Sequence, residues 1–160
     1  MTKFTVIDLF SGAGGLSKGF LDAGYNVVLG IDFNDSALKS FECNHGDTKA
    51  LKLDLFDINN VDLIVDEFSK QYKSLDVLIG GPPCQAYSTI GRANNKSKKS
   101  TDKRIYLYKH YLDFLDKYKP KFFVFENVKG LLSFKDLSGE LLLPKIICEF
   151  DKCGYEVDYQ

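Results

Sequence analysis

Short apolar runs alternate with longer helix-like stretches along this whole sequence, and this alternation constrains the fold more than any other feature. Five runs have the length and composition of β-strands, at residues 4–9, 27–31, 50–53, 75–79 and 121–125. Consecutive strand–helix–strand units of this kind build a parallel sheet that is covered by helices on both faces. We therefore expect an open, mostly parallel α/β sheet.

The segments between these runs predict helices at residues 16–23, 36–43, 61–72, 106–118 and 137–153. Pro144 lies within the last of them, so we expect a break or a late helix start there. Residues 155–160 have the pattern of the opening of a sixth strand. A sheet that stops at that point keeps an uncovered edge, which complete proteins normally avoid. We therefore expect a sheet that is incomplete at the C-terminus and a chain that is part of a larger domain.

Composition limits the classes of protein that the sequence can encode. With 160 residues, 44% of them hydrophobic and 27% charged, it is typical of one globular domain at most. No apolar run is long enough to span a bilayer and the N-terminus lacks the layout of a signal peptide, so we expect a cytoplasmic protein with no membrane partner. The four cysteines form no CxxC pair, which favours reduced thiols. Neither His45 nor His110 has a partner at metal-ligand spacing, and no metal site is expected.

A glycine-rich turn at residues 11–16 follows the first expected strand and contains Gly12, Gly14 and Gly15. Glycines let the backbone approach a ligand closely, and the start of the next helix points its amides at that ligand. The spacing is neither that of the GxGxxG phosphate loop nor that of a Walker loop. A tight turn without a ligand is the alternative interpretation.

Acidic and aromatic residues follow the strands at the same edge of the expected sheet. Asp32 ends the second strand about 20 residues after the glycine turn, a position that suits a pair of ribose hydroxyls. Asp54 follows the third strand and is suited to meet the base of a nucleoside, which Phe10 and Phe33 could enclose. Together these residues predict a pocket for a nucleoside joined to an amino acid, without phosphates, and such a pocket suits S-adenosylmethionine. Taken singly, each carboxylate is more often a solvated surface group.

The fourth expected strand runs into two glycines, two prolines and Cys84, and the fifth ends at Glu126. Ligands of open α/β sheets bind outside the carboxyl ends of the strands. Because the prolines stiffen the turn, we expect Cys84 on a rigid elbow at this edge, with Glu126 beside it. A structural cysteine and a glutamate that caps the next turn are the alternatives.

Three segments resemble signature motifs of the cytosine-5 DNA methyltransferases. They are DLFSGAGGL at residues 8–16, GPPCQAYS at residues 81–88 and ENV at residues 126–128, and they occur in the order and spacing of that family over essentially the whole chain. The resemblance implies a Rossmann-like fold of the S-adenosylmethionine-dependent methyltransferase type. It also implies S-adenosylmethionine as cofactor, S-adenosylhomocysteine as product and double-stranded DNA as substrate. Tyr87 stands where the family commonly has Phe.

Roles for individual residues follow from the same resemblance. Cys84 would be the catalytic nucleophile, attacking carbon 6 of a flipped-out cytosine so that carbon 5 can take the methyl group, and Glu126 would contact the base. The implied cofactor contacts are Phe10, Gly12, Gly14, Leu16, Asp32, Phe33, Asp54, Leu55 and Pro83. The implied substrate contacts are Gln85, Ser88, Arg92, Arg104 and Asn127.

Residues 89–103 form a much longer connection than is usual between a strand and a helix. A net charge of −1 gives the chain no overall basic signature, so a polyanion must be bound locally or by residues outside it. Basic side chains in and beside this connection could contact DNA phosphates and close over the base, namely Arg92, Lys96, Lys98, Lys99, Lys103 and Arg104. A merely solvated basic loop is the alternative.

The later elements of the family are not in this sequence: a Gln-x-Arg-x-Arg segment, the target-recognition domain and a final helix. We therefore interpret residues 1–160 as the N-terminal part of the catalytic, cofactor-binding domain. The chain would be a truncated enzyme or one subunit of a split restriction-modification methyltransferase whose partner subunit carries the recognition domain, and we expect it not to methylate DNA alone. Two alternatives are a tRNA cytosine-5 methyltransferase of the DNA type and a non-catalytic S-adenosylmethionine-binding module.

Overall fold

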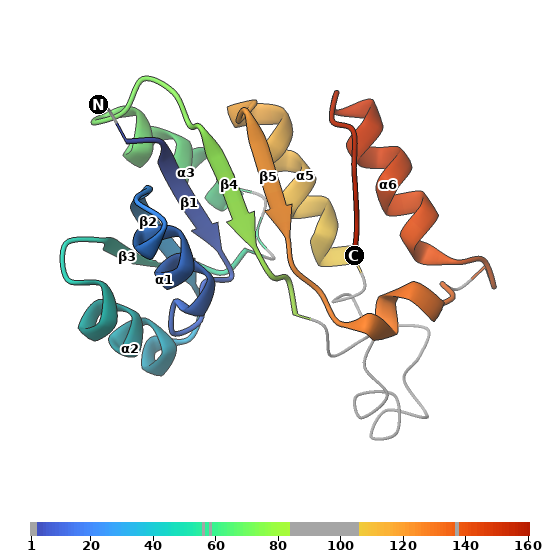
Figure 1. Cartoon of the computed structure of the whole chain (residues 1–160), viewed down its shortest axis with the longest axis horizontal. Helices are drawn as coiled ribbons and strands as arrows, with labels where there is room; N and C mark the ends of the chain where they lie inside the picture. The colour runs from blue at the N-terminus through green and yellow to red at the C-terminus, as the bar shows by residue number, and fades with distance from the viewer. Residues whose placement is uncertain (1–2, 56, 58, 84–105, 137) are drawn as a thin grey trace.

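Five parallel strands form one sheet, in the spatial order β3-β2-β1-β4-β5 (Figure 1). The computed structural model describes residues 3–55, 57, 59–83, 106–136 and 138–160. The strands are β1 (Thr5–Leu9), β2 (Asn26–Asp32), β3 (Lys49–Lys52), β4 (Val77–Gly80) and β5 (Phe122–Phe125). Each neighbouring pair is parallel. The expected open α/β sheet is therefore confirmed.

The chain leaves the centre of this sheet in two directions. From β1 it moves outward through β2 to β3, and it then returns to the other side of β1 to form β4 and β5. The strand order therefore reverses between β1 and β4. In open α/β sheets, the crevice at the carboxyl ends of the strands beside such a reversal is where ligands bind.

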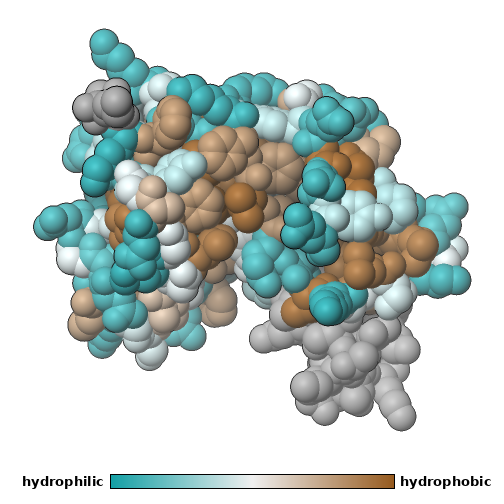
Figure 2. Space-filling model, in the orientation of Figure 1, coloured by the Kyte–Doolittle hydropathy of each residue, from teal (hydrophilic) through white to brown (hydrophobic). Residues whose placement is uncertain are grey.

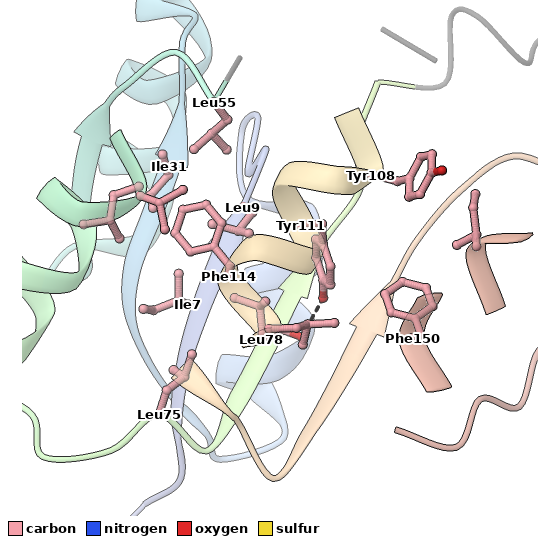
Figure 3. Packing of buried hydrophobic residues seen from close by; sticks show 14 of the residues in the cluster. Ile7, Leu9, Ile31, Leu55, Leu75, Leu78, Tyr108, Tyr111, Phe114 and Phe150 are labelled. Atoms are coloured by element: carbon pink, nitrogen blue, oxygen red, sulfur yellow. Dashed lines mark hydrogen bonds between the residues drawn. The ribbon is translucent and has the colours of Figure 1, made fainter. Parts of the chain in front are cut away.

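Helices cover both faces of the sheet. They are α1 (Gly15–Asp22), α2 (Asp35–His45), α3 (Asn59–Ser69), α5 (Leu107–Tyr118) and α6 (Leu142–Lys152), and a 3-10 helix, η3 (Lys129–Ser133), follows β5. Successive residues of β1 enter different cores, because side chains alternate across a strand. Val6 lies in a small cluster with Phe20 of α1. Ile7 lies in the larger cluster that holds α3 and α5 behind the sheet, with Phe114 among its members (Figures 1 and 3).

Tyr111 ties α5 to the two strands beneath it. Its ring is fully buried, and its hydroxyl lies 3.0 Å from the carbonyl oxygen of Leu78 in β4 (Figure 3). The same hydroxyl lies 3.1 Å from the carbonyl oxygen of Val124 in β5. The ring meets Phe125 and Phe150 edge to face, at centroid distances of 5.2 and 6.3 Å. A buried tyrosine needs apolar contacts for its ring and a hydrogen-bond partner for its hydroxyl. Tyr111 has both, and it thereby joins α5 to α6 and to the sheet.

The element boundaries agree closely with those expected from the sequence. Each expected strand and helix is present within a few residues of its predicted ends. The last helix starts late, at Leu142, and Pro144 lies in its first turn, where the missing N–H of proline costs no hydrogen bond. The helix η3 was not predicted from the sequence. Among the described residues, no helix combines the length and the apolar character needed to cross a membrane.

The predicted opening of a sixth strand is wrong. Residues 155–160 run beside β5 but form no strand (Figure 1). The Tyr155 hydroxyl donates to the carbonyl oxygen of Pro120 at 2.7 Å, and its ring meets Phe123 edge to face at 5.3 Å. Side chains therefore hold this segment, and a groove of about 600 Å³ remains between it, β5 and α6. Hydrophobic side chains gather over this region and the middle of the face shown in Figure 2, and Phe122 and Tyr159 remain exposed.

Replacement of Tyr111 by Phe should lower the free energy of unfolding by about 1–2 kcal/mol, because two buried carbonyl groups lose the hydroxyl that they share. Urea unfolding followed by circular dichroism measures this difference. Tyr118→Phe is the matched control, since the Tyr118 hydroxyl is buried without a hydrogen-bond partner among the described residues. Its removal should change the free energy by less than about 0.5 kcal/mol. Equal losses in the two variants would contradict the role given to Tyr111.

Candidate functional site

The turn between β1 and α1 is shaped by three residues with positive φ angles. Phe10 has φ 59°, Gly12 has φ 56° and Gly14, the N-cap of α1, has φ 86°. Phe10 is the informative one, because a side chain in the left-handed region costs about 1 kcal/mol or more. Strain of this kind is found where the surrounding structure requires it, and it marks this turn as a candidate site.

The backbone amides on the inner side of this turn are already paired. The N–H of Ser11 donates to the carbonyl of Ile31, and the N–H of Gly14 donates to the carbonyl of Ser11, each at 2.9 Å. The N–H of Gly12 donates to Oδ2 of Asp32 at 2.9 Å. Asp32 thus closes the turn from the end of β2, and its other oxygen accepts from the N–H of Asn34.

Three amides at the start of α1 remain available. The N–H groups of Ala13, Gly15 and Leu16 have no acceptor among the described residues. The first amides of a helix have no partner within that helix, and they carry its positive dipole end. They form a place for an anionic group such as a carboxylate.

A narrow cleft adjoins this turn at the carboxyl edge of the sheet. It is lined by Phe10, Asp32, Phe33, Leu53, Asp54, Leu55, Pro83 and Leu107. Six of the nine cofactor contacts predicted from the sequence are in this set, while Gly12, Gly14 and Leu16 belong to the neighbouring turn. Its cavity volume is about 10 Å³, so an aromatic base enters only when a side chain moves. Phe33, 59% exposed, is the side chain with the freedom to do so.

Leu107 was missed by the sequence analysis. It is the first residue of α5, and it is 1% exposed. Nothing in the local pattern separates it from Leu115, the other buried leucine of this helix. Leu16, by contrast, was predicted as a cofactor contact, and its side chain packs into the small core beneath α1. Its free N–H is therefore the group that can face a ligand.

Glu126 lies against the end of β4. Its N–H donates to the carbonyl of Gly80 at 2.9 Å. A Cβ atom built on Gly81 would lie 2.7 Å from Oε2 of Glu126, so only glycine leaves room for the carboxylate in this position. Two residues further along, Pro83 lines the cleft, and the next residue in the sequence is Cys84.

Several predicted site residues lie outside the described part of the chain. They are Cys84, Gln85, Ser88, Arg92 and Arg104. Asn127 is described, and its Oδ1 accepts from the N–H of Val128 at 2.9 Å. Its Nδ2 is buried and has no hydrogen-bond partner among the described residues. A buried amide of this kind is costly unless a ligand or water completes it.

Asp8 is a buried carboxyl group under the glycine turn. It is 1% exposed, and the hydroxyl of Ser17 donates to its Oδ2 at 2.6 Å. Burial raises the pKa of Asp8 to about 7, although the hydrogen bonds from Ser17 oppose this increase. Neighbouring charges act in both directions on this pKa, since His45 lowers it and Asp32 raises it.

Strand order, crevice and cleft together define a Rossmann-like α/β domain of the type found in S-adenosylmethionine-dependent methyltransferases. Residues 4–160 match the model of the family described as C-5 cytosine-specific DNA methylase, and the chain belongs to this family. The resemblance to this family that was noted from the sequence is thereby confirmed.

Two similar proteins are Type II methyltransferases by name. The chain is 36% identical over 152 residues to the Type II methyltransferase M.AgeI of Thalassovita gelatinovora, covering 95% of this chain and 33% of that protein. It is also 36% identical over 152 residues to M.DdeI of Desulfomicrobium norvegicum, covering 95% of this chain and 34% of that protein. The chain therefore spans about a third of the length of these relatives.

A solved structure has the same fold. The crystal structure of a prophage-encoded protein from E. coli, described as a DNA modification methyltransferase, superposes with a TM-score of 0.70 at 29% identity. The match covers 94% of this chain and 38% of that one. The shared part is thus nearly all of the sheet and helices described above.

The raised pKa of Asp8 predicts a pH-dependent stability. In the unfolded chain this carboxyl loses its proton near pH 4, whereas in the folded chain it keeps the proton to about pH 7. Its contribution to stability is therefore complete below pH 4 and is lost as the pH rises to 7. Between pH 4 and pH 7, the free energy of unfolding of Asp8→Asn should therefore rise relative to that of wild type by on the order of 2–4 kcal/mol. Above pH 7 the difference between the two proteins should stay constant.

Urea unfolding at pH 4, 5.5, 7 and 8 measures this difference. Asp47→Asn removes an exposed carboxyl group and serves as the control, for which the curves should run parallel to those of wild type. Parallel curves for Asp8→Asn as well would contradict a protonated Asp8 in the folded protein.

Proposed function

We propose that this chain carries the cofactor pocket and the nucleophile of a DNA (cytosine-5)-methyltransferase. The observation that supports this most directly is the meeting of two strand ends, where the Glu126 carboxylate lies against Gly81. From that point the chain passes through Pro83, in the wall of the cleft, to Cys84. A carboxylate and a thiol supplied by neighbouring strand ends beside a ligand cleft are what the reaction requires.

We propose that the cleft, once a side chain such as Phe33 moves, and the turn hold S-adenosylmethionine, which would supply the activated methyl group when bound. Asp32 and Asp54, both in the cleft wall, would accept hydrogen bonds from the nucleoside, and the rings of Phe10 and Phe33 would enclose its base. The amides at the start of α1, which have no acceptor among the described residues, would bind the carboxylate of the amino-acid part. Among the described residues that line the pocket there is no lysine or arginine, which is compatible with a ligand without phosphates. S-adenosylhomocysteine would be the product that remains.

Cys84 is proposed to attack carbon 6 of the target cytosine as a thiolate. A sulfur–carbon bond forms, and the ring electrons make carbon 5 nucleophilic, so that carbon 5 takes the methyl group. Loss of the proton from carbon 5 and elimination of the thiolate then restore the aromatic ring. A free thiol has a pKa of about 8.5 and is only slightly ionised at neutral pH, so the site must favour the thiolate.

Glu126 and Asn127 are proposed to hold the cytosine during this attack. Glu126 would bond the ring nitrogen and the exocyclic amine, stabilising the charge that develops in the ring. The buried Nδ2 of Asn127, which lacks a partner among the described residues, would gain one when the substrate is present. Both residues follow β5, so they are held by the same strand.

Double-stranded DNA is the proposed substrate, and its target base must leave the duplex to reach this site. Gln85, Ser88, Arg92 and Arg104 are proposed as DNA contacts from the connection that follows Cys84. Since the chain spans about a third of its relatives, we propose that recognition of the target sequence is supplied by further polypeptide, in the same protein or in a partner subunit. The chain alone should then bind the cofactor without methylating DNA efficiently.

Transfer of labelled methyl groups from S-adenosylmethionine to DNA tests this function. We would assay the chain alone and then the chain supplemented with the C-terminal portion that its relatives possess, using tRNA as a second substrate. Transfer to DNA that requires the added portion, and that is lost in Cys84→Ala, is the expected result. Cofactor binding without transfer to DNA under any condition would contradict the catalytic role.

Gly81→Ala should separate the geometry of this site from the stability of the fold. The new Cβ atom displaces the Glu126 carboxylate, whose side chain is exposed and can move. We expect methyl transfer in the supplemented assay to fall by about 10- to 100-fold, because small displacements of a reacting group are costly. The free energy of unfolding should change by less than about 1 kcal/mol.

Gly19→Ala is the control, because a Cβ atom at this position of α1 meets no other atom within 4 Å. It should leave methyl transfer unchanged. If Gly81→Ala transferred methyl groups as fast as wild type, the proposed position of Glu126 would be wrong.

A further inference from the structure

Two side chains from the end of α2 bind the glycine turn. Asn44 donates from Nδ2 to the carbonyl oxygen of Ala13 at 3.3 Å. His45 donates from Nε2 to the carbonyl oxygen of Gly14 at 2.8 Å. The sequence analysis gave His45 no role, because the contact joins residues that are 31 positions apart.

The His45 ring is buried, and its hydrogen bond fixes its tautomer. It is 8% exposed, and since a carbonyl can only accept, Nε2 must carry the proton. Its other ring nitrogen, Nδ1, is buried without a partner among the described residues. The hydrogen bond to Gly14 is therefore the only one that this imidazole makes with the described residues.

The helix behind His45 lies directly on the backbone that it supports. A Cβ atom on Gly14 would overlap His45, and one on Gly30 of β2 would overlap the ring of Phe41. The rings of Phe41 and His45 are themselves packed 4.4 Å apart. Because close packing at two glycines leaves no free space, α2, β2 and the turn must move together.

The bond from His45 sets the direction of an amide that faces away from it. The Gly14 carbonyl and the Gly15 N–H belong to one planar trans peptide, in which the two groups point in opposite directions. The N–H of Gly15 is one of the three amides without an acceptor among the described residues. The same carbonyl accepts the first hydrogen bond of α1, from the N–H of Lys18 at 2.9 Å, so both of its acceptor positions are used.

We propose that His45 is a positioning residue that aims the Gly15 amide of the glycine turn at the carboxylate of the cofactor's amino-acid part. Asn44 assists it by holding the neighbouring Ala13–Gly14 peptide, whose N–H donates to the Ser11 carbonyl. This inference rests on the proposed function and adds residues that touch no ligand. The helix α2 starts at Asp35, just after Asp32 and Phe33 on the nucleoside side of the pocket, and ends at His45 on the amino-acid side. Loss of the His45 hydrogen bond should therefore weaken the binding of the amino-acid part of the ligand and leave the binding of the nucleoside part unchanged.

The test compares two ligands by titration calorimetry with the whole chain. S-adenosylhomocysteine has the amino-acid part, and 5′-methylthioadenosine has the same nucleoside without it. His45→Leu fills the buried site but cannot donate, and we expect it to bind S-adenosylhomocysteine about 3- to 10-fold more weakly, the effect of one hydrogen bond. Its affinity for methylthioadenosine should stay within twofold of wild type. His45→Gln keeps a donor and should restore most of the loss.

Asn44→Ala changes an exposed residue and so tests the same idea if His45→Leu does not fold. It should lower the affinity for S-adenosylhomocysteine about 2- to 5-fold and leave the affinity for methylthioadenosine unchanged. His110→Leu, which alters the only other histidine of the chain, on α5, should change neither affinity.

Each result decides between two explanations. Equal losses for both ligands, or no rescue by His45→Gln, would show that His45 only stabilises the fold and would overturn the inference. Unchanged affinity for S-adenosylhomocysteine in both His45→Leu and Asn44→Ala would overturn it as well. If wild type bound neither ligand, the proposed function itself would fall, and this inference with it.

Discussion

The pairing of β1 with two neighbours at once is the constraint on which the rest of the structure depends. Asp8 of this strand lies opposite Gly30 in β2 and opposite Ile79 in β4, so the ends of the three strands are set at one level. Val6 and Ile7 are both fully buried, on opposite faces, so β1 supplies side chains to the cores on both sides of the sheet. The turns that follow the three strands are therefore brought to a common edge before any ligand is present.

The sequence predicts most of this arrangement because hydrophobic periodicity and strand ends are local signals. Apolar runs gave the strands, and the rule that ligands bind at carboxyl ends gathered Asp32, Phe33 and Pro83 at one cleft. The same signals failed for residues 155–160, where Tyr155 and Val157 have the pattern of a strand. A strand also needs a neighbour with free backbone groups at the right distance, and no local pattern reports that.

The roles of residues that act through contacts with distant parts of the chain could not be predicted from the sequence. The histidine of α2 and the glycine turn meet only because the sheet brings them together, and an isolated histidine in a sequence carries no sign of its partner. The protonated state of Asp8 is of the same kind. Its place in a motif is visible in the sequence, but its pKa depends on how completely α1 and the strands exclude water.

The turn that results has its inward-pointing amides paired, while amides on its outer side have no acceptor among the described residues. Hydrogen bonds from Ser11 and Gly12 point inward, to Ile31 and Asp32, while the amides of Ala13 and Gly15 are left without acceptors among the described residues. A ligand that binds here requires no rearrangement of the backbone, because folding has already ordered these amides. The same hydrogen bonds hold Phe10 at a positive φ angle, a conformation that the residue alone would avoid.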